Sequence, residues 1–167
     1  MSAATKATPD TTPDTDMTPD TTPDVTPNPT SKDRALPLIA VDAYEILSPE
    51  EITSTKAIRA DDPYLEGHYP DFTIYPGVFV IESVTQTVRI FAEQTFQIPL
   101  DLELAAIGSV RFSSPMLPGD TLHVRCRCTS SGDDLLKVKA ECRNAAGEKA
   151  AQMKLEFRLI KGADDAA

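Results

Sequence analysis

Cysteine and histidine are scarce in this chain of 167 residues, which argues against a metal centre. There are three cysteines, an odd number without C-x-x-C spacing, and only two histidines to join them. Zinc and redox sites usually need closely spaced thiols or imidazoles. We therefore expect Cys126, Cys128 and Cys142 to be buried, reduced thiols, with a metal or redox site as the alternative. The sequence predicts no bound metal.

Long apolar runs are also missing. No uncharged stretch approaches the roughly 20 residues that a helix needs to cross a bilayer. The N-terminus has no basic segment followed by an apolar one, so it does not look like a signal peptide. The sequence predicts a cytoplasmic protein that makes no contact with a membrane.

Positive charge is in short supply as well. Lys and Arg number 16 against 26 Asp and Glu, a formal net charge of −10. Residues 1–33 hold six Asp and two Lys, a net of −4, which leaves −6 for the rest of the chain. Binding to nucleic acid depends on neutralising phosphates, so this acidic body argues against a nucleic-acid partner.

The chain has one segment that should not fold. Residues 8–30 read TPDTTPDTDMTPDTTPDVTPNPT, in which proline removes backbone donors and aspartates repel one another. We predict disordered tails at 1–33 and 162–167. Between them, 34–161 is long enough for one domain with a conventional core.

The C-terminal half alternates between apolar and polar residues. In TLHVRCRCT (121–129), LKVKAECR (136–143) and MKLEFRL (153–159), every second side chain is apolar and most of the others are charged. Successive side chains of a strand point to opposite faces, so each segment predicts a strand with one face in water. The turn residues at 118–120 and 131–133 suit an antiparallel meander.

One segment has the length and pattern of a helix. VFVIESVTQTVRIFAEQTF (78–96) runs for 19 residues without Gly or Pro. Its apolar residues recur at helical spacing, and the predicted stripe consists of Val78, Ile81, Val84 or Thr85, Val88 and Ala92. Because β-branched residues are poor helix formers, burial must hold this helix.

These elements define the predicted architecture. Further strands are expected at 51–60 and 103–115, and the apolar segment 36–47 precedes them. A single antiparallel sheet has one apolar face to cover, and one long helix is available to cover it. We predict an α+β fold in which a curled antiparallel β-sheet wraps around one long central α-helix.

Four residues could carry chemistry beside this helix. His68 lies in a proline-rich loop before it, and an imidazole can accept a proton near neutral pH. Glu82 lies near the apolar stripe, where burial raises the pKa of a carboxyl, and Gln86 follows one turn later. A helix that begins at Gly77 presents free backbone N–H groups. A base, an acid and an oxyanion donor are the groups needed to remove a proton α to a carbonyl and expel a β-hydroxyl. The alternatives are a packing or turn residue for His68 and a helix-edge position from which Glu82 reaches solvent.

These residues also stand in a recognisable motif. GHYP (67–70), PGV (76–78) and E-x-x-x-Q (82–86) resemble the motif of the FabZ/FabA-type (3R)-hydroxyacyl-acyl-carrier-protein dehydratases, which belong to the hotdog superfamily. That motif reads G-H-F-P, then P-G-V, with a Glu fourteen residues after the His. LAAIGSVRFSSPMLPGD (104–120) is similar to the family's strand and following turn. The resemblance covers roughly 36–160.

The resemblance implies a hotdog fold, a dimer, and an active site between the two protomers. It implies that His68 removes the C2 proton, Glu82 protonates the departing C3 hydroxyl, and the Gly77 N–H polarises the thioester carbonyl. Gln86 would orient Glu82. The product would be a trans-2-enoyl thioester on an acyl carrier protein, made in fatty acid or polyketide biosynthesis without a cofactor.

Other residues bear on the substrate and the partner. Tyr75, Phe79 and Phe91 are candidates to line an acyl pocket, with a role in the core as the alternative. Basic residues are common in the family where Ser113 and Ser114 stand here. The candidates to meet an acidic carrier are Arg89, Arg111, Arg125 and Arg127, with a solvated strand face as the alternative. Bulky residues around Glu82, at 83–85, imply a specialised acyl chain.

Two other functions remain open at this point. One is a non-catalytic hotdog subunit that pairs with an active chain of different sequence. The assembly would then be a heterodimer, instead of a homodimer or a larger oligomer built from dimers. The other is a thioesterase, since hotdog proteins also hydrolyse thioesters.

Overall fold

The computed structural model describes residues 38–65, 68–69, 71–96, 100–132 and 134–161. The tails predicted at 1–33 and 162–167 lie outside these residues, so their disorder stays a prediction. The elements, in chain order, are β1 (Ala43–Ser48), β2 (Glu51–Ala57), a 3₁₀ turn (Pro63–Leu65), α1 (Gly77–Phe96), β3 (Leu100–Phe112), β4 (Thr121–Ser130), β5 (Leu135–Arg143) and β6 (Lys149–Lys161).

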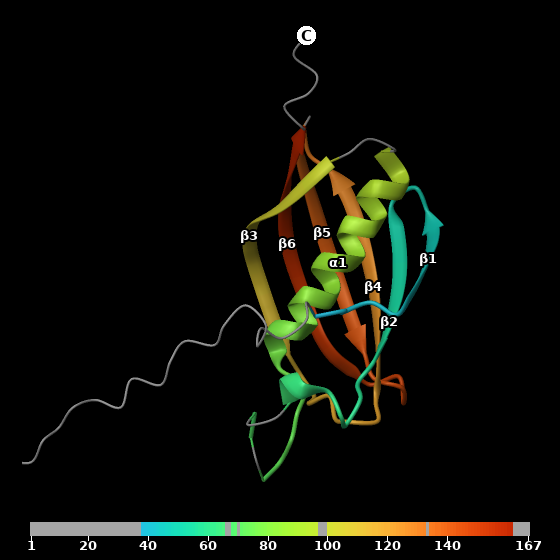
Figure 1. Cartoon of the computed structure of the whole chain (residues 1–167). Helices are drawn as coiled ribbons and strands as arrows, with labels where there is room; N and C mark the ends of the chain where they lie inside the picture. Colours follow the sequence, from blue (N-terminus) through green and yellow to red (C-terminus); the bar gives the residue numbers. More distant parts are fainter. Residues whose placement is uncertain (1–37, 66–67, 70, 97–99, 133, 162–167) are drawn as a thin grey trace, which may run out of the picture. The chain divides into compact units, whose positions relative to one another are not determined.

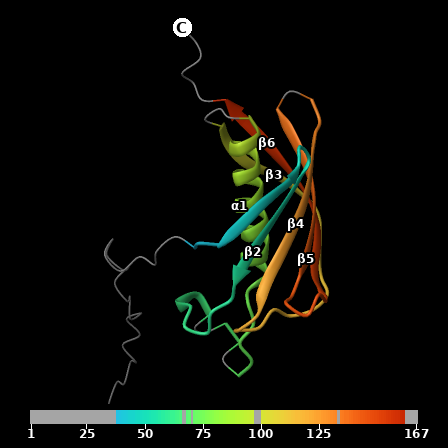
Figure 2. The same ribbon diagram turned by 90° about the vertical axis from the view of Figure 1, so that its right-hand side faces the viewer.

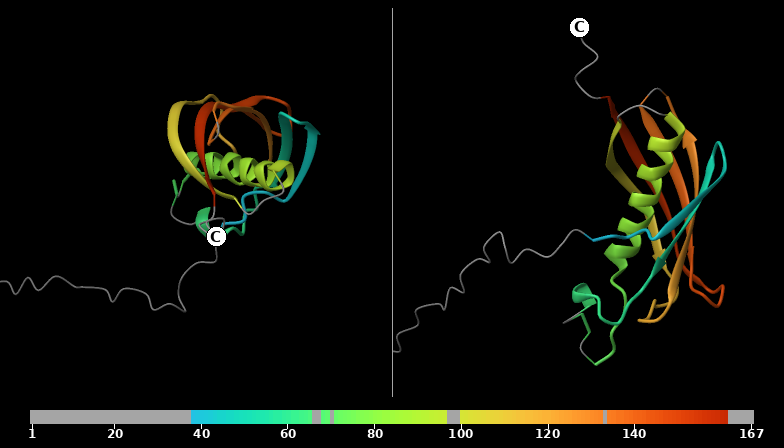
Figure 3. Two further views of the ribbon diagram at one scale, coloured as in Figure 1. Left: turned by 90° about the horizontal axis from the view of Figure 1, so that it is seen from above. Right: turned by 45° about the vertical axis from the view of Figure 1, so that its right-hand side comes forward.

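The strands form one antiparallel sheet in the order β1-β2-β4-β5-β6-β3. Helix α1 crosses its concave face (Figure 1), and the side view shows the helix on one side of the sheet only (Figure 2). Seen from above, the sheet curls around the helix (Figure 3). The predicted α+β architecture, a curled antiparallel sheet around one long helix, is confirmed.

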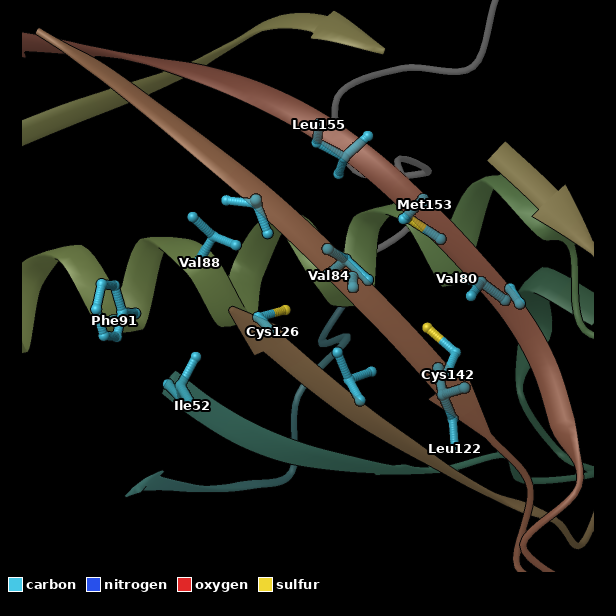
Figure 4. Close-up of a cluster of buried hydrophobic side chains, with 14 of the residues drawn as sticks. Ile52, Val80, Val84, Val88, Phe91, Leu122, Cys126, Cys142, Met153 and Leu155 are labelled. Atoms are coloured by element: carbon cyan, nitrogen blue, oxygen red, sulfur yellow. The ribbon is translucent and has the colours of Figure 1, made fainter. Parts of the chain in front are cut away.

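The alternating segments behave as their pattern predicts. On β4, Leu122, Val124, Cys126 and Cys128 are buried, while the residues between them are exposed. Figure 4 shows how side chains from α1 meet those from β2, β4, β5 and β6 in one core. The burial of apolar surface between these two layers drives the fold, at about 25 cal/mol for each Å² removed from water.

Helix α1 begins at Gly77, directly after Pro76, as predicted. The residues that it buries are Val80, Ser83, Val84, Thr85, Thr87, Val88, Phe91 and Ala92. The predicted stripe is wrong at its first member, because Val78 is 66% exposed. Helical periodicity gives the spacing of a stripe but not the residue at which burial begins, and here the first buried residue is Val80.

Several polar groups on the buried side of α1 are satisfied locally. Ser83 Oγ donates to the Phe79 carbonyl (2.9 Å), and Thr87 Oγ1 donates to the Ser83 carbonyl (2.6 Å). Thr87 also shares a hydrogen bond of 2.6 Å with Ser54 on β2. These bonds remove the cost of burying hydroxyl groups in an apolar interface. None of the described helices is long and apolar enough to cross a membrane.

The three cysteines are free and buried on the inner face of the sheet. In the described ranges, no group of three His, Cys, Asp or Glu side chains could hold a metal ion. Burial raises the pKa of Cys128 and of Cys142 to about 12, and the pKa of Cys126 rises well above its usual value for the same reason. Since the thiolate is the reactive form, all three thiols should be inert in the folded protein.

We therefore expect the folded protein not to react with a thiol-specific disulfide reagent at mildly alkaline pH. After unfolding in guanidinium, all three cysteines should react. Spectroscopic titration of the released chromophore measures both states. Rapid labelling of the folded protein would contradict the burial described above.

Candidate active site

A cavity of about 470 Å³ lies where the loop before α1 meets the segment after β3. The loop contributes His68, Ile74 and Tyr75, and the start of the helix contributes Gly77 and Val80. The full lining is His68, Tyr69, Ile74, Tyr75, Gly77, Val80, Phe112, Ser113, Ser114, Pro115, Met116 and Ala150. Three predicted site residues, His68, Gly77 and the acyl-pocket candidate Tyr75, thus line one mostly apolar cavity.

His68 is held in a defined orientation. Its ring Nδ1 lies 2.9 Å from the carbonyl oxygen of Ile74. A carbonyl can only accept a hydrogen bond, so Nδ1 is the donor and carries the proton in the neutral ring. The other ring nitrogen, Nε2, then holds a lone pair and can act as a base.

The residue after His68 adopts an unusual backbone conformation. Tyr69 has a φ of 54°, the only positive φ recorded at a described residue other than glycine. Its ring packs edge-on against the His68 ring, with 4.8 Å between the centroids. Conformations of this kind cost energy and concentrate at functional sites, where surrounding contacts hold them. Here the conformation turns the chain directly beside the imidazole.

Gly77 brings the start of the helix against the cavity wall. A Cβ built at this position would lie 2.8 Å from Cζ of Phe112, so any larger residue would displace that ring. The Phe79 and Val80 N–H groups bond to the Pro76 carbonyl, whereas the Gly77 N–H has no acceptor among the described residues. A free N–H at a helix N-terminus suits an anion or a polarised carbonyl oxygen.

Glu82 lies in the second turn of α1 and is half-buried. Its Oε1 accepts a hydrogen bond of 2.9 Å from Gln86 Nε2, across one helical turn. The predicted contact between these two residues is therefore confirmed. The other carboxyl oxygen makes no hydrogen bond to a residue that the structure describes.

The single chain does not bring all four residues into one cavity. His68 and Gly77 line it, but Glu82 and Gln86 are absent from its described lining. The chain therefore presents two separate half-sites, a base with a helix N-terminus and an oriented carboxyl group. The catalytic roles of these residues, and a site shared between two protomers, stay predictions.

The three aromatic candidates lie in different surroundings. Tyr75 lines the cavity and packs edge-on against Phe79, with 5.6 Å between the ring centroids. Phe79 also packs against Tyr64, again at 5.6 Å. Phe91 is 2% exposed and lies in the core between α1 and the sheet (Figure 4). Contact between any of them and an acyl chain stays a prediction.

Sequence reasoning did not identify the wall formed after β3. Phe112, Pro115 and Met116 line the cavity, and Ala150 on β6 joins them. The Ser113 N–H bonds to the Ala150 carbonyl at 2.8 Å, which joins this segment to the sheet. The sequence of 104–120 predicts a strand and a turn, but the contact of this run with the His68 loop is long-range and leaves no local signal.

The candidate arginines of the strands lie on the outer face of the sheet. Arg127 pairs with Lys139 in register, and Lys139 with Lys154, so three cations stand opposite one another on adjacent strands. Like charges in such positions repel. With Arg111 and Arg125 they surround a shallow hollow of about 810 Å³. Arg89, also exposed, lies on α1.

One buried group in the cavity wall lacks a hydrogen bond. Tyr75 is 3% exposed, and its hydroxyl has no partner among the described residues. Burial raises the pKa of Tyr75 to about 12, although the nearby Ser83 hydroxyl partly offsets this effect. The phenol is therefore neutral, and its buried hydroxyl makes no hydrogen bond to a described residue.

We expect Tyr75→Phe to increase the free energy of unfolding by about 1 kcal/mol, because a buried hydroxyl without a partner costs roughly 1–3 kcal/mol. Denaturant titration measures this change. Tyr44→Phe is the control, since Tyr44 is 49% exposed and should change stability little. A clear loss of stability in Tyr75→Phe would show that the hydroxyl has a partner in the native protein.

Comparison with known proteins identifies the family to which the chain is similar. Residues 45–157 match the family model ApeI-like, described as ApeI dehydratase. The 3-hydroxyacyl-[acyl-carrier-protein] dehydratase FabZ of Polynucleobacter necessarius is 31% identical over 131 residues, which are 76% of this chain and 87% of that protein. FabZ of Polynucleobacter asymbioticus is 37% identical over 94 residues, which are 54% of this chain and 62% of that protein, less than two thirds of its length.

Solved structures support the fold. The dehydratase heterocomplex ApeI:P from Xenorhabdus doucetiae aligns over 70% of this chain and 94% of that one, with 21% identity and a TM-score of 0.53. AziG of S. sahachiroi aligns over 72% and 91%, with 18% identity and a TM-score of 0.58. The hotdog fold and the resemblance to FabZ-type proteins are thus confirmed, and the chain belongs to the ApeI-like dehydratase family.

Proposed function

We propose that this protein dehydrates (3R)-3-hydroxyacyl thioesters, carried on an acyl carrier protein, to trans-2-enoyl thioesters in fatty acid or polyketide biosynthesis. The observation that carries the proposal is the cavity lined by His68 and Gly77, together with the Glu82 carboxyl group, which Gln86 orients on helix α1. Membership of a dehydratase family supports it.

In this proposal His68 is the base. The Ile74 carbonyl holds the proton on Nδ1, which leaves the Nε2 lone pair to remove the C2 proton of the substrate. Electron density then moves toward the thioester carbonyl oxygen. The unbonded N–H of Gly77 lies in the same cavity and would stabilise that oxygen through a hydrogen bond.

Glu82 is the acid. Its protonated oxygen gives a proton to the C3 hydroxyl as the C3–O bond breaks, so the oxygen leaves as water and the C2–C3 double bond forms. Gln86 holds the other carboxyl oxygen, which fixes the direction of the acidic proton. Base and acid must face the two ends of the same C2–C3 bond. Because the single chain places His68 but not Glu82 in the cavity lining, we propose that the two groups meet across a dimer.

The edge of the sheet supports dimer formation. Strand β3 is 13 residues long, and among the described strands it pairs only with β6, which leaves its other edge open there. Ile107 and Phe112 on this strand are 52% and 51% exposed. A long open edge with exposed apolar residues is a template for pairing with another chain. Pairing there would also cover Phe112, which lines the cavity.

In this proposal an acidic carrier would dock on the outer face of the sheet. Arg111, Arg125 and Arg127 line the hollow there and would attract it. The substrate reaches the cavity on the phosphopantetheine arm in this proposal. The reaction would take place in the cytoplasm.

The partner strand need not come from an identical chain. The similar structure from Xenorhabdus doucetiae is a heterocomplex, so a second hotdog chain is the alternative to a homodimer. Such a pair could leave this chain as a non-catalytic subunit. The intact His68, Gly77 and Glu82 support a catalytic role instead.

We expect the purified protein to convert a (3R)-3-hydroxyacyl carrier thioester to a product lighter by one water. Intact-mass spectrometry of the carrier measures this directly, across a panel of acyl chains. Release of the free acid would indicate a thioesterase instead. A sound dimer that leaves every member of the panel unchanged would contradict the proposed function.

We expect His68→Ala and Glu82→Gln each to lower kcat by roughly 100-fold or more, because a positioned acid or base contributes about 100- to 10,000-fold. Thermal unfolding should change little, since both residues are only half-buried. His123→Ala removes the other, exposed histidine and is the matched control. Wild-type turnover in either variant would exclude that residue from the chemistry.

A further inference from the structure

Strand β2 carries a lysine where the fold would favour an apolar residue. Its inward positions are Ile52, Ser54 and Lys56, and Lys56 is only 9% exposed. A lysine is rarely buried unless it is paired. Its partner is Asp42, whose Oδ1 lies 2.9 Å from Lys56 Nζ, with the lysine side chain 11% exposed and the aspartate 40%.

Asp42 does more than neutralise the lysine. Its Oδ2 accepts a hydrogen bond of 2.7 Å from the Ala57 N–H, and its own N–H bonds to the Thr55 carbonyl at 2.8 Å. Burial alone would raise the pKa of Asp42, but the bonds from Ala57 and Lys56 outweigh it and hold the pKa below its usual value. The ionised side chain therefore fixes the segment that precedes β1 onto β2.

That segment, residues 38–42, continues to the helix. The Gln86 amide oxygen accepts a hydrogen bond of 2.9 Å from the Ala40 N–H, and its Nε2 donates to the Leu38 carbonyl at 2.9 Å. The same Nε2 donates to Glu82 Oε1 at 2.9 Å. Both N–H bonds of the amide are thus used, one by the segment and one by the carboxyl group.

The backbone of this segment decides which way the amide faces. Ala40 offers a donor and Leu38 an acceptor, so only one of the two flipped orientations of the Gln86 amide fits both. In that orientation the NH₂ group faces Glu82. In the other, the amide oxygen would face the carboxyl oxygen, and the contact would be repulsive when Glu82 is ionised.

We propose that Asp42 and Lys56 are positioning residues for Glu82, acting through the 38–42 segment and the Gln86 amide. The ion pair holds the segment on β2, the segment selects the amide orientation, and the amide orients the carboxyl group. Neither residue touches the reacting atoms. The inference rests on the proposed function, because only that function makes the orientation of Glu82 important. The coupling between the ion pair and the Gln86 amide can be measured without it.

The first test uses no substrate. In full-length protein labelled with ¹⁵N at glutamine, the Gln86 side-chain amide is identified by the signal that Gln86→Ala removes. Asp42→Asn keeps the side-chain shape but replaces one acceptor oxygen with a donor. We expect it to shift the Gln86 amide signal and to accelerate its hydrogen exchange at least tenfold. Lys56→Met should have the same effect. If Asp42→Asn does not fold, Lys56→Met takes its place in the test.

The control is another Asp within an ion pair. Asp61 pairs with Arg59 at 3.0 Å, but both side chains are 72% exposed. Asp61→Asn should leave the Gln86 signal and its exchange rate unchanged. The inference is overturned when folded Asp42→Asn and Lys56→Met both leave that signal as in the wild type.

The second test uses turnover. We expect Asp42→Asn to lower kcat by roughly tenfold with KM nearly constant, a fraction of the effect of losing a positioned acid. In a Gln86→Ala background the same change should have no further effect, because the connection is already broken. Additive losses, or a rise in KM alone, would overturn the inference. Failure of the wild type to dehydrate any substrate would refute the proposed function and leave the amide measurement to decide the coupling.

Discussion

The packing of α1 across the concave face of the sheet is the interaction on which the rest of the structure depends. The helix is rich in Val, Ile and Thr, which have a high intrinsic propensity for strands. Burial against β2, β4, β5 and β6 overrides that preference (Figure 4). Because the core needs one face of this helix, its opposite face and its first turn remain available for chemistry.

The same packing determines where the chemical groups lie. The helix begins at Gly77 against the cavity wall, and Glu82 and Gln86 follow one and two turns later. A rigid helix fixes the distance between these groups, whereas His68 reaches the cavity from a loop that the Ile74 carbonyl holds in place. The segment 38–42 adds a contact from outside the helix, so the orientation of Glu82 depends on residues that are remote in sequence.

Much of this could be predicted because it is local. Strands β4 to β6 follow from strict alternation, and the helix start follows from Pro76-Gly77. Exposure of Val78 could not be predicted, since periodicity does not say where contact with the sheet begins. The ion pair of Lys56 with Asp42 could not be predicted either, because the two residues lie 14 positions apart in the sequence. The cavity wall at 112–116 depends on tertiary contact alone.

In the proposed mechanism, a complete acid–base pair forms only between two protomers. The most direct test mixes His68→Ala with Glu82→Gln after unfolding and refolding them together. Each mixed dimer has one intact site, so random pairing should restore about a quarter of wild-type activity from two inactive proteins. Native mass spectrometry confirms that mixed dimers have formed. Mixed dimers without recovered activity would contradict the account.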